Sequence, residues 1–126
     1  MTGARILIVD DDELLCEMLA SLFRMSGYEV AVAHDGEAGI AKLATDGADL
    51  VVLDLVMPKM DGLRFLRMLP ERIEKPPRVI VASASATPDM DKNLGHAQIA
   101  AVVRKPVKPA LLLATVAEAL EKPVRG

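Results

Sequence analysis

The chain has 126 residues and a formal net charge of −3, and 52% of its residues are hydrophobic and 26% charged. This composition excludes a disordered chain, and the length fits one domain and leaves no room for a second. Lysines and arginines are scattered rather than clustered, which excludes a basic surface for direct nucleic-acid binding. We expect a single domain with its core at about residues 4–121 and a short C-terminal tail at 122–126.

Short runs of β-branched and aliphatic residues alternate with segments of helical periodicity along the chain. In chain order we expect a strand at about 5–9, a helix at 13–25, a strand at 28–33, a helix at 37–45, a strand at 50–54, a helix at 63–69, a strand at 78–83, a helix within 89–98, a strand at 99–104 and a helix at 109–121. Five such βα units favour an α/β fold with a parallel sheet, right-handed crossovers and helices on both faces.

Individual residues refine the prediction for three of these helices. The helix at 63–69 is expected to end before Pro70, because proline removes a helical hydrogen bond. Gly95 interrupts the segment 89–98, which has the least regular helical pattern. In the helix at 37–45 we expect Ile40, Leu43 and Ala44 to pack inward.

No apolar stretch approaches membrane-spanning length, and the first residues lack the charged and apolar regions of a secretory signal. Cys16 is the single cysteine, so the chain cannot form an internal disulfide. Its neighbours are leucines and methionine, which predicts a buried thiol that packs as a small hydrophobic group. Together these features predict a cytoplasmic protein without membrane contact.

Reactive side chains follow four of the predicted strands. Asp10 and Asp11 follow the first strand, Asp54 closes the apolar run 50–53, Ser83 ends the strand 78–83, and Lys105 follows the strand 99–104. The carboxyl ends of parallel strands share one edge of the sheet, where ligands bind in open α/β folds. We therefore expect an acidic pocket that also holds one hydroxyl group and one amine.

Three carboxylates a few ångströms apart repel one another by about 4 kcal/mol per close pair at an effective dielectric near 20. A divalent cation removes this repulsion, and hard oxygen ligands suit Mg²⁺. The alternative is that Asp10, Asp11 and Asp12 only cap the following helix, a role that we assign to Asp12 in either case. Lys105 could equally be solvated, and Ser83 could belong to an ordinary loop.

Together these residues resemble the response-regulator receiver family, and the resemblance covers essentially the whole chain. The matching pieces, in family order and with family-like spacing, are Ile6-Leu7-Ile8-Val9-Asp10-Asp11, Leu53-Asp54-Leu55-Val56-Met57-Pro58, Met60-Asp61-Gly62, Ser83-Ala84 and Lys105-Pro106. The resemblance implies a flavodoxin-like, doubly wound (βα)5 fold with strand order 2-1-3-4-5.

The resemblance also implies a two-component or phosphorelay function. Asp54 would accept a phosphoryl group from a phosphohistidine on a sensor histidine kinase or a histidine phosphotransfer protein. Ser83 and Lys105 would contact the phosphoryl oxygens. The implied ligands of Mg²⁺ or Mn²⁺ are Asp10, Asp11, Asp54 and the backbone carbonyl of Val56. Such a protein is a signalling phospho-acceptor and at most catalyses its own phosphorylation and dephosphorylation.

The resemblance further implies that a downstream protein would bind an output surface made of the fourth helix, the strand 99–104 and the last helix. This surface departs from the family pattern, because Val102 stands where an aromatic residue usually reports phosphorylation. Val107 likewise replaces a frequent phenylalanine. His34 and His96 are expected to be exposed side chains without a role in the chemistry.

The sequence leaves two alternative functions open. A pseudo-receiver would keep the fold as a binding module without being phosphorylated. A phosphotransferase of the haloacid-dehalogenase type would also use an aspartate at a strand end with Mg²⁺, but it needs a second acid two residues later, where this chain has Val56.

Overall fold

The computed structural model describes residues 3–55, 62–84 and 99–121. Its elements are β1 (Arg5–Val9), α1 (Glu13–Met25), β2 (Glu29–Ala33), α2 (Gly36–Asp46), β3 (Leu50–Asp54), α3 (Gly62–Arg72), β4 (Arg78–Ser83), β5 (Ile99–Arg104) and α5 (Pro109–Glu121). Four predicted strands and two predicted helices have these same bounds. The helix expected within 89–98 lies outside the described residues.

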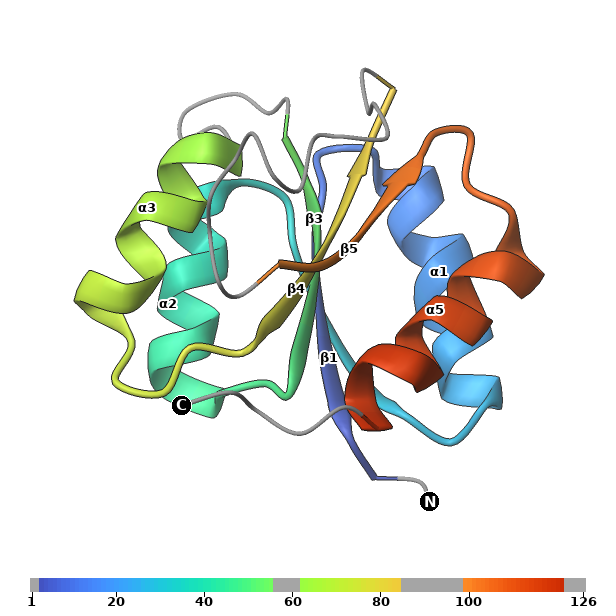
Figure 1. Ribbon diagram of the computed structural model, residues 1–126, viewed down its shortest axis with the longest axis horizontal. Helices are drawn as coiled ribbons and strands as arrows, with labels where there is room; N and C mark the ends of the chain where they lie inside the picture. Colours follow the sequence, from blue (N-terminus) through green and yellow to red (C-terminus); the bar gives the residue numbers. More distant parts are fainter. Residues whose placement is uncertain (1–2, 56–61, 85–98, 122–126) are drawn as a thin grey trace.

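The five strands form one parallel sheet in the order β2-β1-β3-β4-β5. Helices α2 and α3 cover one face of the sheet, and α1 and α5 cover the other (Figure 1). This arrangement confirms the predicted flavodoxin-like α/β fold with helices on both faces. It also brings the carboxyl ends of all five strands to one edge of the sheet.

Successive strand residues point to opposite faces, so the sheet contributes to two hydrophobic cores. Val51 and Leu53 of the central strand β3 belong to the core that contains Phe65 of α3. Leu50 and Val52 belong to the core that contains Phe23 of α1. All of β3 is buried, which explains why its sequence is an unbroken apolar run rather than an alternating one.

Helices α1 and α2 begin at aspartates that cap them. The Oδ1 atom of Asp12 accepts a hydrogen bond from the main-chain N–H of Leu15 at 3.1 Å, which confirms the capping role predicted for Asp12. Asp35 does the same for the N–H of Ala38 at 2.8 Å. Each cap satisfies a helical N–H that has no partner within the helix.

Two local predictions are wrong. Helix α3 continues through Pro70 to Arg72, because a proline near the end of a helix forfeits one hydrogen bond while the last turn still closes. Indeed the N–H of Ile73 donates to the carbonyl of Leu69 at 2.9 Å. Ala44 is exposed rather than inward, since the buried stripe of α2 is narrow and position 44 lies at its margin. That stripe consists of Gly36, Gly39, Ile40 and Leu43.

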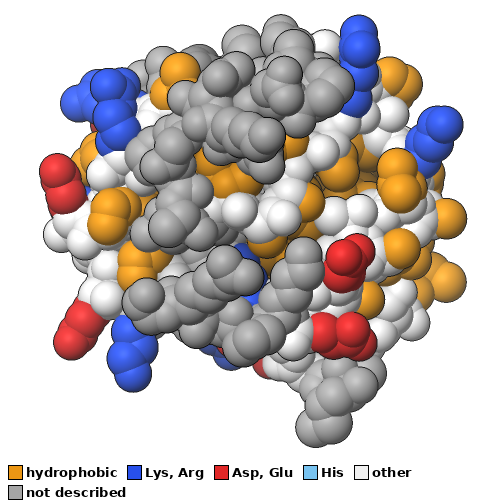
Figure 2. Space-filling model, in the orientation of Figure 1, with side chains coloured by type: hydrophobic (Ala, Val, Ile, Leu, Met, Phe, Trp, Pro, Cys, Tyr) orange, Lys and Arg blue, Asp and Glu red, His pale blue; other side chains and the backbone are white. Residues whose placement is uncertain are grey.

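Several large hydrophobic side chains remain on the surface, and in Figure 2 such side chains gather on the side formed by α1 and α5. Leu14, Met18 and Met25 of α1 and Leu111 of α5 are exposed. None of the helices in the described part of the chain is long and apolar enough to cross a membrane.

Candidate functional site

The acidic pocket lies where the strand order reverses. β1 and β3 are neighbours in the sheet, yet the helices that follow them cover opposite faces. A crevice at the carboxyl ends of such strands is the usual ligand site of a doubly wound sheet. Asp10 follows β1 and is 3% exposed, and Asp54 ends β3 and is 7% exposed. The fold thus places two nearly buried carboxylates side by side.

Asp10 is held through both its side chain and its main chain. Its Oδ1 atom accepts a hydrogen bond from the N–H of Asp12 at 3.0 Å, and its Oδ2 atom accepts one from Nζ of Lys105 at 2.8 Å. Its own main-chain N–H donates to the carbonyl of Ala33 at 3.0 Å. These contacts fix the direction in which the carboxylate points.

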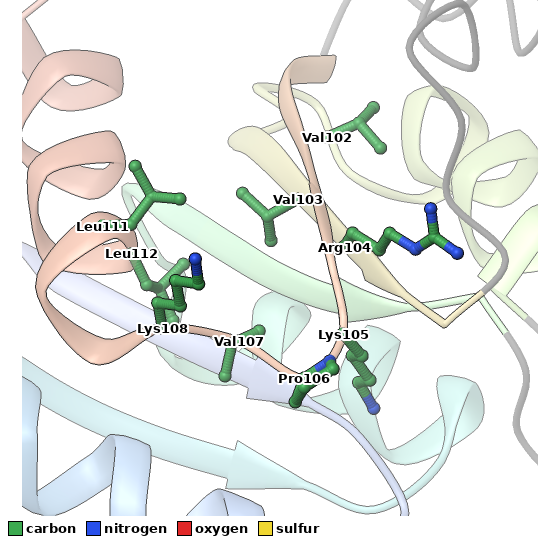
Figure 3. Close-up of a pocket in the computed structure, with 9 residues that line it drawn as sticks. All are labelled: Val102, Val103, Arg104, Lys105, Pro106, Val107, Lys108, Leu111 and Leu112. Carbon is green, nitrogen blue, oxygen red and sulfur yellow. The ribbon is translucent and has the colours of Figure 1, made fainter.

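Lys105 supplies the cation of the pocket. Its Nζ atom lies 3.4 Å from Oδ2 of Asp54 as well as 2.8 Å from Asp10. Burial lowers the pKa of the Lys105 ammonium group. Hydrogen bonding to Asp10 and the charges of Asp10 and Asp54 raise this pKa by more than burial lowers it, so the pKa lies above the ordinary 10.5. Lys105 is therefore a cation at neutral pH. Figure 3 shows its side chain extending away from Leu111 and Leu112 of α5.

Oxygen atoms of Asp10, Asp11 and Asp54 lie within 4.8 Å of one another. Asp11 is exposed, so this cluster is open to solvent on one side. Such a set contains only hard oxygen donors, which suit Mg²⁺ and leave positions for water or phosphate. The predicted convergence of the strand ends is therefore present in the structure.

Ser83 is 1% exposed and ends β4, the strand between β3 and β5. Its main-chain carbonyl accepts a hydrogen bond from the N–H of Lys105 at 3.0 Å, which fixes the start of the Lys105 loop. Val102 on β5 is half-buried and packs against the core on the α2 and α3 side. Val56, the predicted carbonyl ligand, lies outside the described residues.

Three further residues adjoin the site without having been assigned a role there. Cys16 is buried, as predicted, and its thiol donates to the carbonyl of Asp10 at 3.3 Å. His34 is exposed, as predicted, but its Nδ1 atom lies 3.1 Å from the same carbonyl. At Gly62, an added Cβ atom would lie 2.6 Å from the carbonyl oxygen of Asp54. No sequence signal marks the first two, while Gly62 belongs to the motif Met60-Asp61-Gly62.

Comparison with known proteins agrees with this geometry. The family model for the response regulator receiver domain matches residues 6–117. The chain is 41% identical over 91 residues to the transcriptional regulatory protein CpxR of Klebsiella pneumoniae, an alignment that covers 72% of this chain and 38% of CpxR. It is 37% identical over 91 residues to the transcriptional regulatory protein PhoP of Bacillus subtilis. The chain thus spans little more than a third of the length of these relatives.

Solved structures resemble the whole described fold. A CheY-like response regulator receiver domain protein from Methanospirillum hungatei has 29% identity and a TM-score of 0.81, with 95% of each chain covered. The chemotaxis response regulator CheY4 of Vibrio cholerae has 26% identity and a TM-score of 0.81, with 94% of this chain and 99% of CheY4 covered. The match over residues 6–117 and these likenesses show that the chain belongs to the family of response regulator receiver domains, the signalling modules of two-component systems.

Proposed function

We propose that Asp54 is the phospho-acceptor of this receiver domain and that a phosphohistidine is the donor. The observation that carries the proposal is the contact of Nζ of Lys105 with both Asp10 and Asp54, beside the oxygen cluster formed with Asp11. In the reaction an oxygen of the Asp54 carboxylate forms a bond to phosphorus while the P–N bond of phosphohistidine breaks. The electron pair of that bond leaves with the imidazole.

The pocket contributes positioning and charge rather than an acid or base. Phosphoryl transfer needs little covalent help from the protein and depends on alignment and on neutralising the phosphoryl oxygens. Lys105 is suited to bind one of these oxygens, and the hydroxyl group of Ser83 to bind another. Only 7% of Asp54 is exposed, so few water molecules can reach its carboxylate in competition with the donor.

The divalent cation that suits this site is Mg²⁺ or Mn²⁺. Asp10, Asp11 and Asp54 would hold it through oxygen atoms, together with the main-chain carbonyl of Val56. When bound, the cation offsets the charge of the carboxylates and of the incoming phosphoryl group.

Intact-mass spectrometry after incubation with Mg²⁺ and either acetyl phosphate or phosphoimidazole tests the proposal. We expect one phosphate adduct on the wild-type chain and none on Asp54→Asn. Asp46→Asn is the matched control, because Asp46 is an exposed carboxylate at the end of α2; it should keep the adduct. An unmodified wild-type chain with both donors, or an adduct on Asp54→Asn, would refute the assignment.

We further propose that the partners are a sensor histidine kinase or a histidine phosphotransfer protein on the input side and a protein target on the output side. A hollow of about 460 Å³ between β5 and α5 supports the second proposal (Figure 3). Val103 and Leu111 contribute apolar surface to its lining, and Arg104 and Lys108 contribute charged side chains. Amide NMR shifts on phosphorylation should therefore be larger at Val103 and Leu111 than in α2. Equal shifts in both places would contradict this output surface.

A further inference from the structure

The carbonyl oxygen of Asp10 accepts hydrogen bonds from two side chains that belong to different parts of the fold. Nδ1 of His34, the first residue after β2, lies 3.1 Å from this oxygen. Sγ of Cys16, near the start of α1, lies 3.3 Å from it. Because a carbonyl oxygen only accepts, Nδ1 carries the proton of the imidazole and the thiol is also a donor. The peptide group of Asp10 is thus held from two sides.

The His34 contact takes the place of a hydrogen bond of the sheet. β1 and β2 pair as far as Val9 and Ala33, and the N–H of Asp10 donates to the carbonyl of Ala33. A regular parallel ladder would continue with a main-chain N–H of β2 donating to the carbonyl of Asp10. β2 ends at Ala33, however, because Asp35 turns away to cap α2. The imidazole supplies the donor that the strand no longer provides.

We propose that His34 and Cys16 are positioning residues for Asp10 and, through it, for the divalent cation; this inference rests on the proposed metal-assisted phosphorylation of Asp54. The Asp10 carboxylate is fixed to Asp12 and Lys105 at 3.0 and 2.8 Å. A tilt of its peptide group therefore cannot be absorbed without changing how its oxygens meet those of Asp11 and Asp54. Hydrogen bonds behind a metal ligand hold its orientation in this way, and their loss weakens metal binding.

Both donors face one surface hollow of about 500 Å³ between α1 and the end of β2. Ser21 of α1 lines the same hollow. Ser21 is exposed in this hollow. It makes none of the hydrogen bonds to Asp10 described above, so it offers a matched control on the same surface. The cysteine is buried and the histidine exposed, so water competes only for the histidine bond.

Isothermal titration calorimetry of the unphosphorylated chain with Mg²⁺ tests the proposal. His34→Ala and Cys16→Ala should each weaken Mg²⁺ binding by about three- to tenfold. His34→Asn should recover most of the affinity, because its amide nitrogen occupies the place of Nδ1 in the side chain. Cys16→Ser should do the same through its hydroxyl group, and Ser21→Ala should bind Mg²⁺ as the wild type does.

Thermal unfolding followed by circular dichroism in EDTA confirms beforehand that each variant is folded. Unchanged Mg²⁺ affinity in both alanine variants would overturn the positioning role while leaving the proposed function intact. Failure of His34→Asn to recover affinity that His34→Ala has lost would overturn the hydrogen-bond assignment. Failure of the wild-type chain to bind Mg²⁺ at all would instead overturn the metal site of the proposed function.

Discussion

The ammonium group of Lys105 lies 2.8 Å from Oδ2 of Asp10, although two strands, β3 and β4, separate the strands that lead to these residues. The contact forms because both residues follow the carboxyl ends of their strands, and Oδ2 of Asp54 lies 3.4 Å from the same ammonium group. One cation therefore bridges two carboxylates that are almost excluded from solvent. We therefore expect the charge balance of this pocket to govern how the chain responds to metal, to mutation and to phosphorylation.

Mg²⁺ should stabilise the folded chain. Three carboxylates against one ammonium group leave a formal charge of −2 in the pocket, which a divalent cation neutralises. At ten times its dissociation constant, Mg²⁺ adds about 1.4 kcal/mol to the free energy of unfolding, which raises Tm by roughly 5 °C for a domain of this size. Differential scanning calorimetry with and without EDTA measures the shift.

Carboxylate variants show whether this shift comes from the pocket. Asp11→Asn should lose most of the Mg²⁺-dependent rise in Tm, because it removes one of the clustered oxygens. Asp46→Asn should keep it, since Asp46 is an exposed acid elsewhere on the surface. An equal rise in both variants would mean that Mg²⁺ acts on the general surface charge.

Lys105→Met should destabilise the metal-free chain. The substitution leaves Asp10 and Asp54 without their shared cation, and removing one partner of a buried ion pair costs up to 3–5 kcal/mol. Because the Lys105 side chain is 19% exposed and solvent screens part of the charge, we expect about 2–3 kcal/mol in urea unfolding. Mg²⁺ should then restore more stability than it adds to the wild type. Phosphorylation by acetyl phosphate should become slower, since the contact proposed between Lys105 and the phosphoryl oxygens would be lost.

Lys108→Met is the matched control for this experiment, because Lys108 is an exposed lysine three residues further along the same loop. It should change the free energy of unfolding by less than about 0.5 kcal/mol and leave the phosphorylation rate unchanged. Equal effects of the two variants would show that the Lys105 ammonium has no special role.

Much of this site could be predicted because its residues follow strands with strong local signals. The apolar run before Asp54 predicts a buried strand, and parallel strands necessarily bring Asp10, Asp54 and Lys105 to the same edge. The sequence places one amine among the carboxylates, but it does not predict that Lys105 lies closer to Asp10 than to Asp54. That preference depends on tertiary distances, which residue types do not encode.

The parts that could not be predicted depend on single atoms rather than on patterns. His34 has the exposure expected of a turn residue, yet one ring nitrogen reaches the carbonyl of Asp10. Pro70 is a helix breaker by type, but its effect depends on how near the end of α3 it lies. Sequence periodicity sets the layers of the fold and leaves such contacts undetermined.

Gly62→Ala should weaken Mg²⁺ binding as well as destabilise the fold. An added Cβ atom would lie 2.5 Å from Cα of Leu55 and 2.6 Å from the carbonyl oxygen of Asp54, so the main chain itself must move. We expect a loss of about 1–3 kcal/mol in the free energy of unfolding together with weaker Mg²⁺ binding. Urea unfolding and calorimetric titration measure the two effects.

Gly47→Ala is the control that separates lost stability from weaker Mg²⁺ binding in Gly62→Ala. Gly47 has a φ of 71° at the end of α2 and has open space around it, so alanine there costs roughly 1–2 kcal/mol through backbone strain alone. Its Mg²⁺ affinity should equal that of the wild type. If both glycine variants lose affinity in proportion to their stability, the close approach of Gly62 to Asp54 has no specific effect on the site.

Cys16 should resist alkylation in the folded chain. Burial, followed by the negative charges of Asp10 and Asp12, raises the pKa of the Cys16 thiol from 9.0 to about 12. At pH 8 the reactive thiolate is then about a thousandfold scarcer than for a thiol with the ordinary pKa. Iodoacetamide labelling followed by mass spectrometry should therefore be at least about a hundredfold slower in buffer than in concentrated urea, and the single cysteine makes the adduct unambiguous.

The raised pKa of Cys16 makes both the stability of the fold and the labelling rate depend on pH. Because the folded pKa is raised, the buried thiol stabilises the fold fully below pH 9, where both states are protonated. This contribution declines as pH rises from about 9 to about 12, since the unfolded thiol ionises first. The labelling rate of the folded chain should likewise keep rising above pH 9, where the rate in urea levels off. A plateau near pH 9 in the folded chain would show that Cys16 is open to solvent and that its bond to the Asp10 carbonyl is not maintained in solution.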